Sequence, residues 1–174
     1  FKKLGIGMMG GKSLFHDFRP PSAGPYQRTE KDIERNRHTA ETSGHYYRLM
    51  INHVGNVLKN IKRVYPDYDV RSGYQLSGFV WFQGWNDMYN EDARAEYAQN
   101  LVNLIKDVRH ELAAEDLPVV IGELGNGGED VSDNMKSIRN AQKTAAEKTH
   151  HAYFVKTTQF ARPKEQSPNV GHGH

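Results

Sequence analysis

The sequence contains no cysteine and no long apolar run, and both absences exclude classes of site. Without cysteine, the 174-residue chain has no disulfide, no thiolate metal ligand and no cysteine nucleophile. No apolar run approaches the roughly 18 residues needed to cross a bilayer, so we expect no membrane span. A lack of cysteine fits the cytoplasm and an exported protein equally, so the compartment stays open.

An excess of charge of one sign is also missing. The formal net charge is +2, and the basic residues are interleaved with acids along the chain, although the sequence pI is near 8.7. Because nucleic-acid binding requires clustered basic residues, we expect no nucleic-acid partner. With 37% hydrophobic and 25% charged residues, the length fits one globular domain that buries a core.

The two ends predict that residues 1–174 form a single partial domain, incomplete at both ends. The chain begins at Phe1 and is already in an apolar run by Leu4. It stops at His174, directly after a loop. We therefore expect the middle and late part of a longer domain.

Apolar runs of strand length alternate with stretches of helical periodicity. This alternation predicts an α/β fold with a doubly wound parallel sheet and flanking helices. Such sheets bind ligands at the carboxyl ends of their strands. The expected strands are 4–9, 76–82, 118–125 and 152–157, and the expected helices are 44–65, 92–114 and 132–148.

Glycines and polar residues follow three of the expected strands, at 10–13, 83–87 and 123–128. The first segment suggests a phosphate-binding loop, but a Walker A motif ending at Ser13 needs glycine where the chain has Ile6. Prolines also follow where a helix should begin. A nucleotide-binding enzyme that depends on Lys12 is therefore the weakest of three functional hypotheses.

The stretch FVWFQGWND, residues 79–87, is the most specific motif in the chain. Its amide side chains leave a buried strand beside tryptophans, an arrangement that suits a developing oxyanion. The motif resembles that of the SGNH hydrolases, in particular the sialate O-acetylesterase-like carbohydrate esterases. The GGKSL turn, the VVIGELGNGG strand and loop, and the terminal GHGH follow the family's order over nearly the whole chain.

The resemblance implies a three-layer, SGNH/flavodoxin-like fold and an oxyanion hole built from two loops. A backbone N–H would come from Gly10 or Gly11. The side-chain donor would be Gln83 or Asn86, and the sequence leaves that choice open. The glycines could instead serve a tight turn.

The catalytic histidine implied by the resemblance is His172 or His174, although these residues also fit a polar tail or a metal-binding tract. The family's nucleophilic serine block would precede Phe1, so we expect this chain alone to be inactive. The family's aspartate, three residues before the histidine, is replaced by Asn169 or Gly171.

The triad acid is therefore not assigned. Its candidates are Glu165, Asp87 and Glu123. The residues predicted to bind substrate are Arg19, Trp85, Asp87, Glu123 and Asn126.

The resemblance predicts a serine esterase that removes acetyl groups from a carbohydrate and requires no cofactor or metal. The alternative is a catalytically inactive carbohydrate-binding module of the same fold. Export to the periplasm or the outside of the cell is plausible for this family. The oligomeric state and the identity of the sugar stay open.

Overall fold

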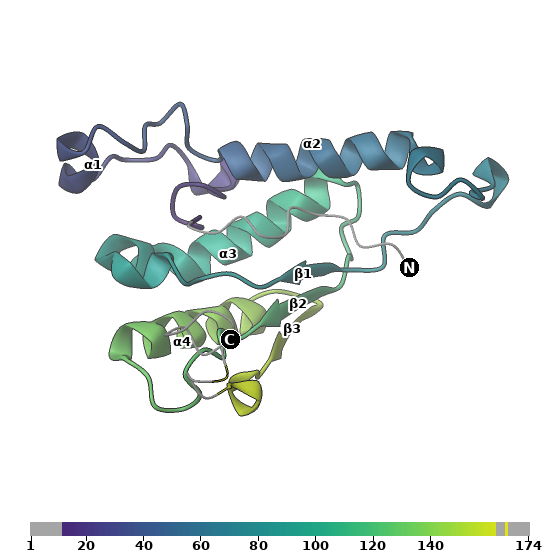
Figure 1. Cartoon of the computed structure of the whole chain (residues 1–174). Coiled ribbons are helices and arrows are strands. Elements are labelled where there is room, and N and C mark those ends of the chain that lie inside the picture. Colours follow the sequence, from purple (N-terminus) through teal and green to yellow (C-terminus); the bar gives the residue numbers. More distant parts are fainter. Residues whose placement is uncertain (1–11, 163–165, 167–174) are drawn as a thin grey trace.

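A computed structural model describes residues 12–162 and Gln166, and its architecture is α/β (Figure 1). Three parallel strands form one sheet in the order β1-β2-β3. They are β1 (Phe79–Trp81), β2 (Val119–Gly122) and β3 (Ala152–Val155). The predicted parallel sheet with flanking helices is confirmed, whereas the strand expected at 4–9 lies outside the described residues.

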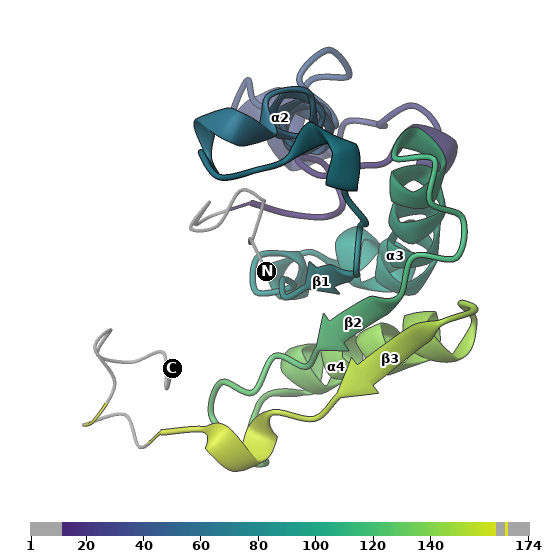
Figure 2. The same ribbon diagram turned by 90° about the vertical axis from the view of Figure 1, so that its right-hand side faces the viewer.

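Each strand is linked to the next by a helix. These helices are α3 (Glu91–Glu111) and α4 (Asp133–Glu147). Both lie on one face of the sheet and pack against each other (Figure 2). The remaining helices are α1 (Glu30–Glu34) and α2 (His45–Lys59), and short 3-10 turns occupy Pro21–Ala23, Ile61–Arg63, Val70–Ser72, Asp87–Tyr89 and Thr158–Phe160. Within the described part of the chain, no helix has the length and apolar character that a bilayer crossing requires.

The boundaries of the long helices follow from capping residues. The Asn90 side chain accepts a hydrogen bond from the Ala93 N–H at the start of α3, and Ser132 accepts one from Met135 N–H at the start of α4. The helix expected at 44–65 is shorter than predicted, because Asn60 leaves helical geometry after Lys59. Its amide side chain donates to the Asn56 carbonyl in the last turn.

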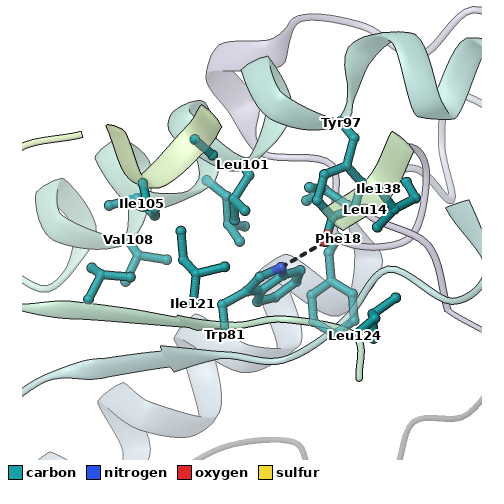
Figure 3. Packing of buried hydrophobic residues seen from close by; sticks show 14 of the residues in the cluster. Leu14, Phe18, Trp81, Tyr97, Leu101, Ile105, Val108, Ile121, Leu124 and Ile138 are labelled. Carbon is teal, nitrogen blue, oxygen red and sulfur yellow. Dashed lines mark hydrogen bonds between the residues drawn. The ribbon is translucent and has the colours of Figure 1, made fainter. Parts of the chain in front are cut away.

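The core lies between the sheet and helices α3 and α4 (Figure 3). Trp81 and Ile121 project from neighbouring strands toward Tyr97 and Leu101 of α3, and all four are at most 5% exposed. The Trp81 Nε1–H donates to the Tyr97 hydroxyl over 3.2 Å. The end of β1 is thereby tied to the helix that follows it.

The opposite face of the sheet is open within the described residues. Val80 and Tyr153 are 70% and 57% exposed. Both are aligned with Val120 of the central strand, so the three residues lie side by side across the sheet. Helices α3 and α4 cover the other face of the sheet (Figure 2).

Candidate functional site

Asp87 joins two loops that are far apart in the sequence. Its carboxylate accepts hydrogen bonds from the backbone N–H groups of Leu14, at 3.0 Å, and Phe15, at 2.9 Å. It also accepts one from Gln83 Nε2 at 2.6 Å. The side chain is fully buried, so these internal donors surround the carboxylate that was predicted to bind substrate. We refer to this arrangement as the Asp87 lock.

Gln83 strengthens the same junction. Its Nε2 also donates to the carbonyl of Lys12 at 2.9 Å, so both amide hydrogens are used within the protein. The Tyr97 hydroxyl lies 2.6 Å from the Gln83 carbonyl and 3.2 Å from its Oε1. Gln83 therefore holds the end of β1 against the segment that begins at Lys12.

Asn86 and Trp85 are more exposed than Asp87, which follows them in the motif. Both are half-buried. The Asn86 side chain forms no hydrogen bond with another residue in the described ranges 12–162 and 166. Trp85 meets Tyr89 edge-on, with ring centroids 6.1 Å apart. Among the described residues, the Asn86 amide thus has no internal partner, whereas both amide hydrogens of Gln83 are used.

Four predicted catalytic residues lie outside the described residues: Gly10, Gly11, His172 and His174. Lys12 follows the two glycines directly in the sequence, and it is bound to Gln83. Phe18, six residues further on, packs edge-on against Trp81 with ring centroids 5.4 Å apart (Figure 3). The described start of this loop therefore lies at the carboxyl end of β1.

Glu123 ties the ends of β2 and β3 together. It is 4% exposed, and its Oε2 accepts hydrogen bonds from the backbone N–H groups of Thr157, at 3.0 Å, and Thr158, at 3.2 Å. The Thr157 hydroxyl donates to the Glu123 carbonyl at 2.7 Å. The Glu123 carboxylate was predicted to contact substrate, and in this structure it binds the backbone that follows β3.

Arg139 holds the loop that contains Asn126. Its guanidinium donates to the carbonyls of Leu124, Asn126 and Gly128 at 2.7 to 3.0 Å. Asn126 is 6% exposed. Sequence reasoning missed Arg139, although a signal existed: the side chain lies four residues after the buried Met135, on the core-facing side of α4.

Gln142 was also missed, and the same pattern could have found it. It lies four residues after the buried Ile138 and is fully buried. Its Nε2 donates to the carbonyls of Gln83 and Gly122, and its Oε1 accepts from the Leu124 N–H. One side chain therefore fixes the loops that follow both β1 and β2.

Arg19 organises its own loop. Its side chain is 9% exposed and donates to the carbonyls of Phe15, Ala23 and Gly24. It also pairs with Glu96 on α3 at 3.1 Å. Arg19 was predicted to contact substrate, and the structure directs its donors to protein oxygens.

The Asp87 lock predicts a dependence of stability on pH. Burial raises the pKa of Asp87 to about 6, although three N–H donors act in the opposite direction. The pKa of an unfolded aspartate is about 3.9, so the folded state binds this proton more tightly. The contribution of Asp87 to the free energy of unfolding should therefore fall as the pH rises from about 4 to about 6.

Urea unfolding of wild-type and Asp87→Asn protein across that range measures the effect. The difference between the two free energies of unfolding should change with pH, because the variant lacks the titrating group. A difference that is constant between about pH 4 and about pH 6 would contradict the assignment.

Comparisons with known proteins show the family of the chain. The sequence profile of a family described as carbohydrate esterase, sialic acid-specific acetylesterase, matches residues 30–169. A protein of Arabidopsis thaliana named as a probable carbohydrate esterase is 29% identical over 58 residues, which are 33% of this chain and 22% of that protein.

The solved structure of an Arabidopsis thaliana protein superposes with a TM-score of 0.51 at 20% identity. The match covers 84% of this chain and 44% of that chain, so the present chain spans less than half of its neighbour. At this identity the superposition shows a shared fold. The profile match extends over most of the sequence and includes the loops that follow all three strands. The chain therefore belongs to the family of carbohydrate esterases described as sialic acid-specific acetylesterases.

Proposed function

We propose that this chain forms part of the site of an enzyme that removes acetyl groups from carbohydrates. The Asp87 lock is the observation that carries the proposal. It holds residues 12–15 against residues 83–87 at the carboxyl end of β1, where parallel sheets bind ligands. The lock uses the N–H groups of Leu14 and Phe15 itself, so its role is to hold the two loops in place, and other groups of these loops are the proposed donors to the ester oxygen.

The proposed mechanism is that of a serine hydrolase. A serine would attack the ester carbonyl, and His172 or His174 would accept its proton and later return it to the leaving alcohol. The carbonyl oxygen would be stabilised by the backbone N–H of Gly10 or Gly11 and by one side-chain amide. Neither a metal nor an organic cofactor is part of this mechanism.

Asn86 is the proposed side-chain donor. Gln83 uses both of its amide hydrogens, on Lys12 and Asp87, so donating to an oxyanion would break an internal bond. The Asn86 amide forms no such hydrogen bond with any of the described residues. Gln83 and Asp87 then act as positioning residues that hold the donor loop in place.

The substrate would lie beside Trp85, whose half-buried ring can stack on a sugar. Asn126, in the loop that follows β2, is proposed to contact the substrate as well. Glu123 and Arg19 would act at a distance from the substrate, by fixing the strand ends and the 15–24 loop. An acetylated carbohydrate is the proposed substrate.

The test is the turnover number for acetate release by the product of the complete gene. Asn86→Ala should lower kcat by about 100-fold or more with little change in KM, because the lost bond forms in the transition state. The matched control is Asn56→Ala on the exposed face of α2, which should leave kcat unchanged. Wild-type turnover by the Asn86 variant would refute its role. Sugar binding without any turnover by the wild-type protein would identify an inactive binding module instead.

A further inference from the structure

We propose that His16, Asp17 and His38 form a binding site for a divalent transition metal ion such as Zn²⁺. One ligand atom from each residue lies within 4.8 Å of the others. His16 and Asp17 belong to the loop held by the Asp87 lock, and His38 belongs to the segment between α1 and α2. His16 directly follows residues 12–15 of the proposed ester-binding loops, but none of the three ligand side chains is a proposed oxyanion donor.

His16 contributes the most informative atom. Its Nε2 lies 3.1 Å from the Thr39 carbonyl, which can only accept, so Nε2 carries the hydrogen. In the neutral ring Nδ1 then presents a lone pair. His16 is 3% exposed, and its buried Nδ1 has no hydrogen-bond partner in the described part of the chain. A buried polar atom without a partner is costly, so the site favours a bound cation.

Asp17 supplies the second ligand. Its Oδ2 accepts hydrogen bonds from Ser13 N–H at 2.8 Å and from the Ser13 hydroxyl at 3.2 Å. Its Oδ1 lies 3.6 Å from His16 Nδ1. A carboxylate oxygen and an imidazole lone pair repel each other unless a proton or a metal lies between them.

His38 supplies the third ligand. Its Nδ1 lies 2.8 Å from Asp32 Oδ1, so Nδ1 carries the hydrogen and Nε2 is left as a ligand. The His38 ring stacks on that of His16, with centroids 4.4 Å apart and planes at 28°. Because the rings are nearly parallel, metal binding requires a rotation of His38, whose side chain is 35% exposed, and the rotated ring must re-form its contact with Asp32.

The surroundings of the two histidines match those of metal ligands. In metal sites, the ring nitrogen that does not bind the metal usually donates to a carbonyl or a carboxylate, which fixes the tautomer. Here the Thr39 carbonyl accepts from His16, and the Asp32 carboxylate accepts from His38. Two imidazoles and one carboxylate are a ligand set that Zn²⁺ accepts, with water in a fourth position.

Two carboxylates and several cations lie close to the histidines, with Lys12 beside Asp17 and Arg28 bound to the Asp32 carbonyl. Asp17 and Asp32 place two carboxylates around the histidines. Arg37 partly offsets this charge, because its Nε lies 3.6 Å from Asp32 Oδ1. Tyr26 donates its hydroxyl to Asp32 Oδ2 at 2.5 Å and packs its ring edge against His16.

Titration of metal-free protein with Co²⁺ and Zn²⁺ tests the proposal. The wild-type chain should bind one ion, and Co²⁺ should give the visible absorption of a low-coordinate nitrogen and oxygen site. His38→Gln and Asp17→Asn should each weaken this binding by at least about 10-fold, because each removes a ligand. Zn²⁺ should also raise the melting temperature of wild-type protein more than that of either variant.

Two controls separate this site from other histidines. His150→Gln with His151→Gln removes the exposed histidines beside Asp116, the other described group with metal-ligand spacing. His172→Gln with His174→Gln removes the terminal pair. Both double variants should retain the ion, and loss of binding in either one would overturn the assignment.

The proposal also fails if wild-type protein binds no ion, or if His38→Gln binds as tightly as wild type. Circular dichroism of each variant without metal checks that its fold is intact. If His38→Gln were unfolded, Asp17→Asn would decide the question alone. Neither readout depends on esterase activity, so the metal site can fail while the proposed function stands.

Discussion

Asp87→Ala is expected to lower the free energy of unfolding by about 3 kcal/mol or more. The change removes a fully buried acceptor and leaves the N–H groups of Leu14 and Phe15, and the Gln83 amide, without their partner. A buried donor that loses its partner typically costs about 1 to 3 kcal/mol. Losses at three donors are not additive, since the loops can relax toward water.

Urea unfolding monitored by tryptophan fluorescence measures this change, because Trp81 and Trp85 lie beside the lock. The matched control is Asp67→Ala, which alters an exposed aspartate and should shift the free energy by less than about 0.5 kcal/mol. Equal midpoints for Asp87→Ala and wild type would show that the two loops are held together by other contacts.

Gly84→Ala is expected to be the second large change, at about 2 to 4 kcal/mol. Gly84 has a φ of 149°, where a residue with a side chain is strained. A Cβ atom at this position would lie 2.8 Å from Ile138 Cγ2 and 3.0 Å from Leu124 Cδ1. Both neighbours belong to the core, so the clash cannot be relieved by moving a flexible surface side chain.

Gly55→Ala provides the matched control for this substitution. Gly55 lies inside α2, and no atom lies within 4 Å of the position that an alanine Cβ would occupy there. Alanine should raise the free energy of unfolding by about 0.4 to 1 kcal/mol, because it favours the helix and restricts the unfolded chain. If Gly84→Ala were as stable as wild type, the loop after β1 could not be as tightly packed as the structure shows.

The secondary structure followed from local patterns of the sequence. Helical periodicity placed α3 and α4 within a few residues of their ends, and short apolar runs placed β1, β2 and β3. The order of strands and helices then predicted a parallel sheet. What the pattern could not show is which face of each strand is covered, as exposed Val80 demonstrates.

The proposed location of the site rests on the sequence, but the internal contacts of several of its residues could not be inferred from it. A carboxylate just after a buried strand was predicted to meet substrate. The donors that surround Asp87 are backbone N–H groups 72 and 73 positions away, and a sequence motif does not reveal them. The proposal of Asn86 rather than Gln83 as the donor likewise depends on which amide is already bonded inside the protein.

The measurement that tests the central claim most directly is acetate release from an acetylated oligosaccharide by the product of the complete gene. It is made before and after treatment with a serine-directed phosphonate. If the ester is hydrolysed at the two loops that the Asp87 lock joins, the protein should release acetate, and the phosphonate should abolish this turnover. Turnover that persists after complete phosphonate labelling, or no turnover at all, would contradict the proposed serine esterase.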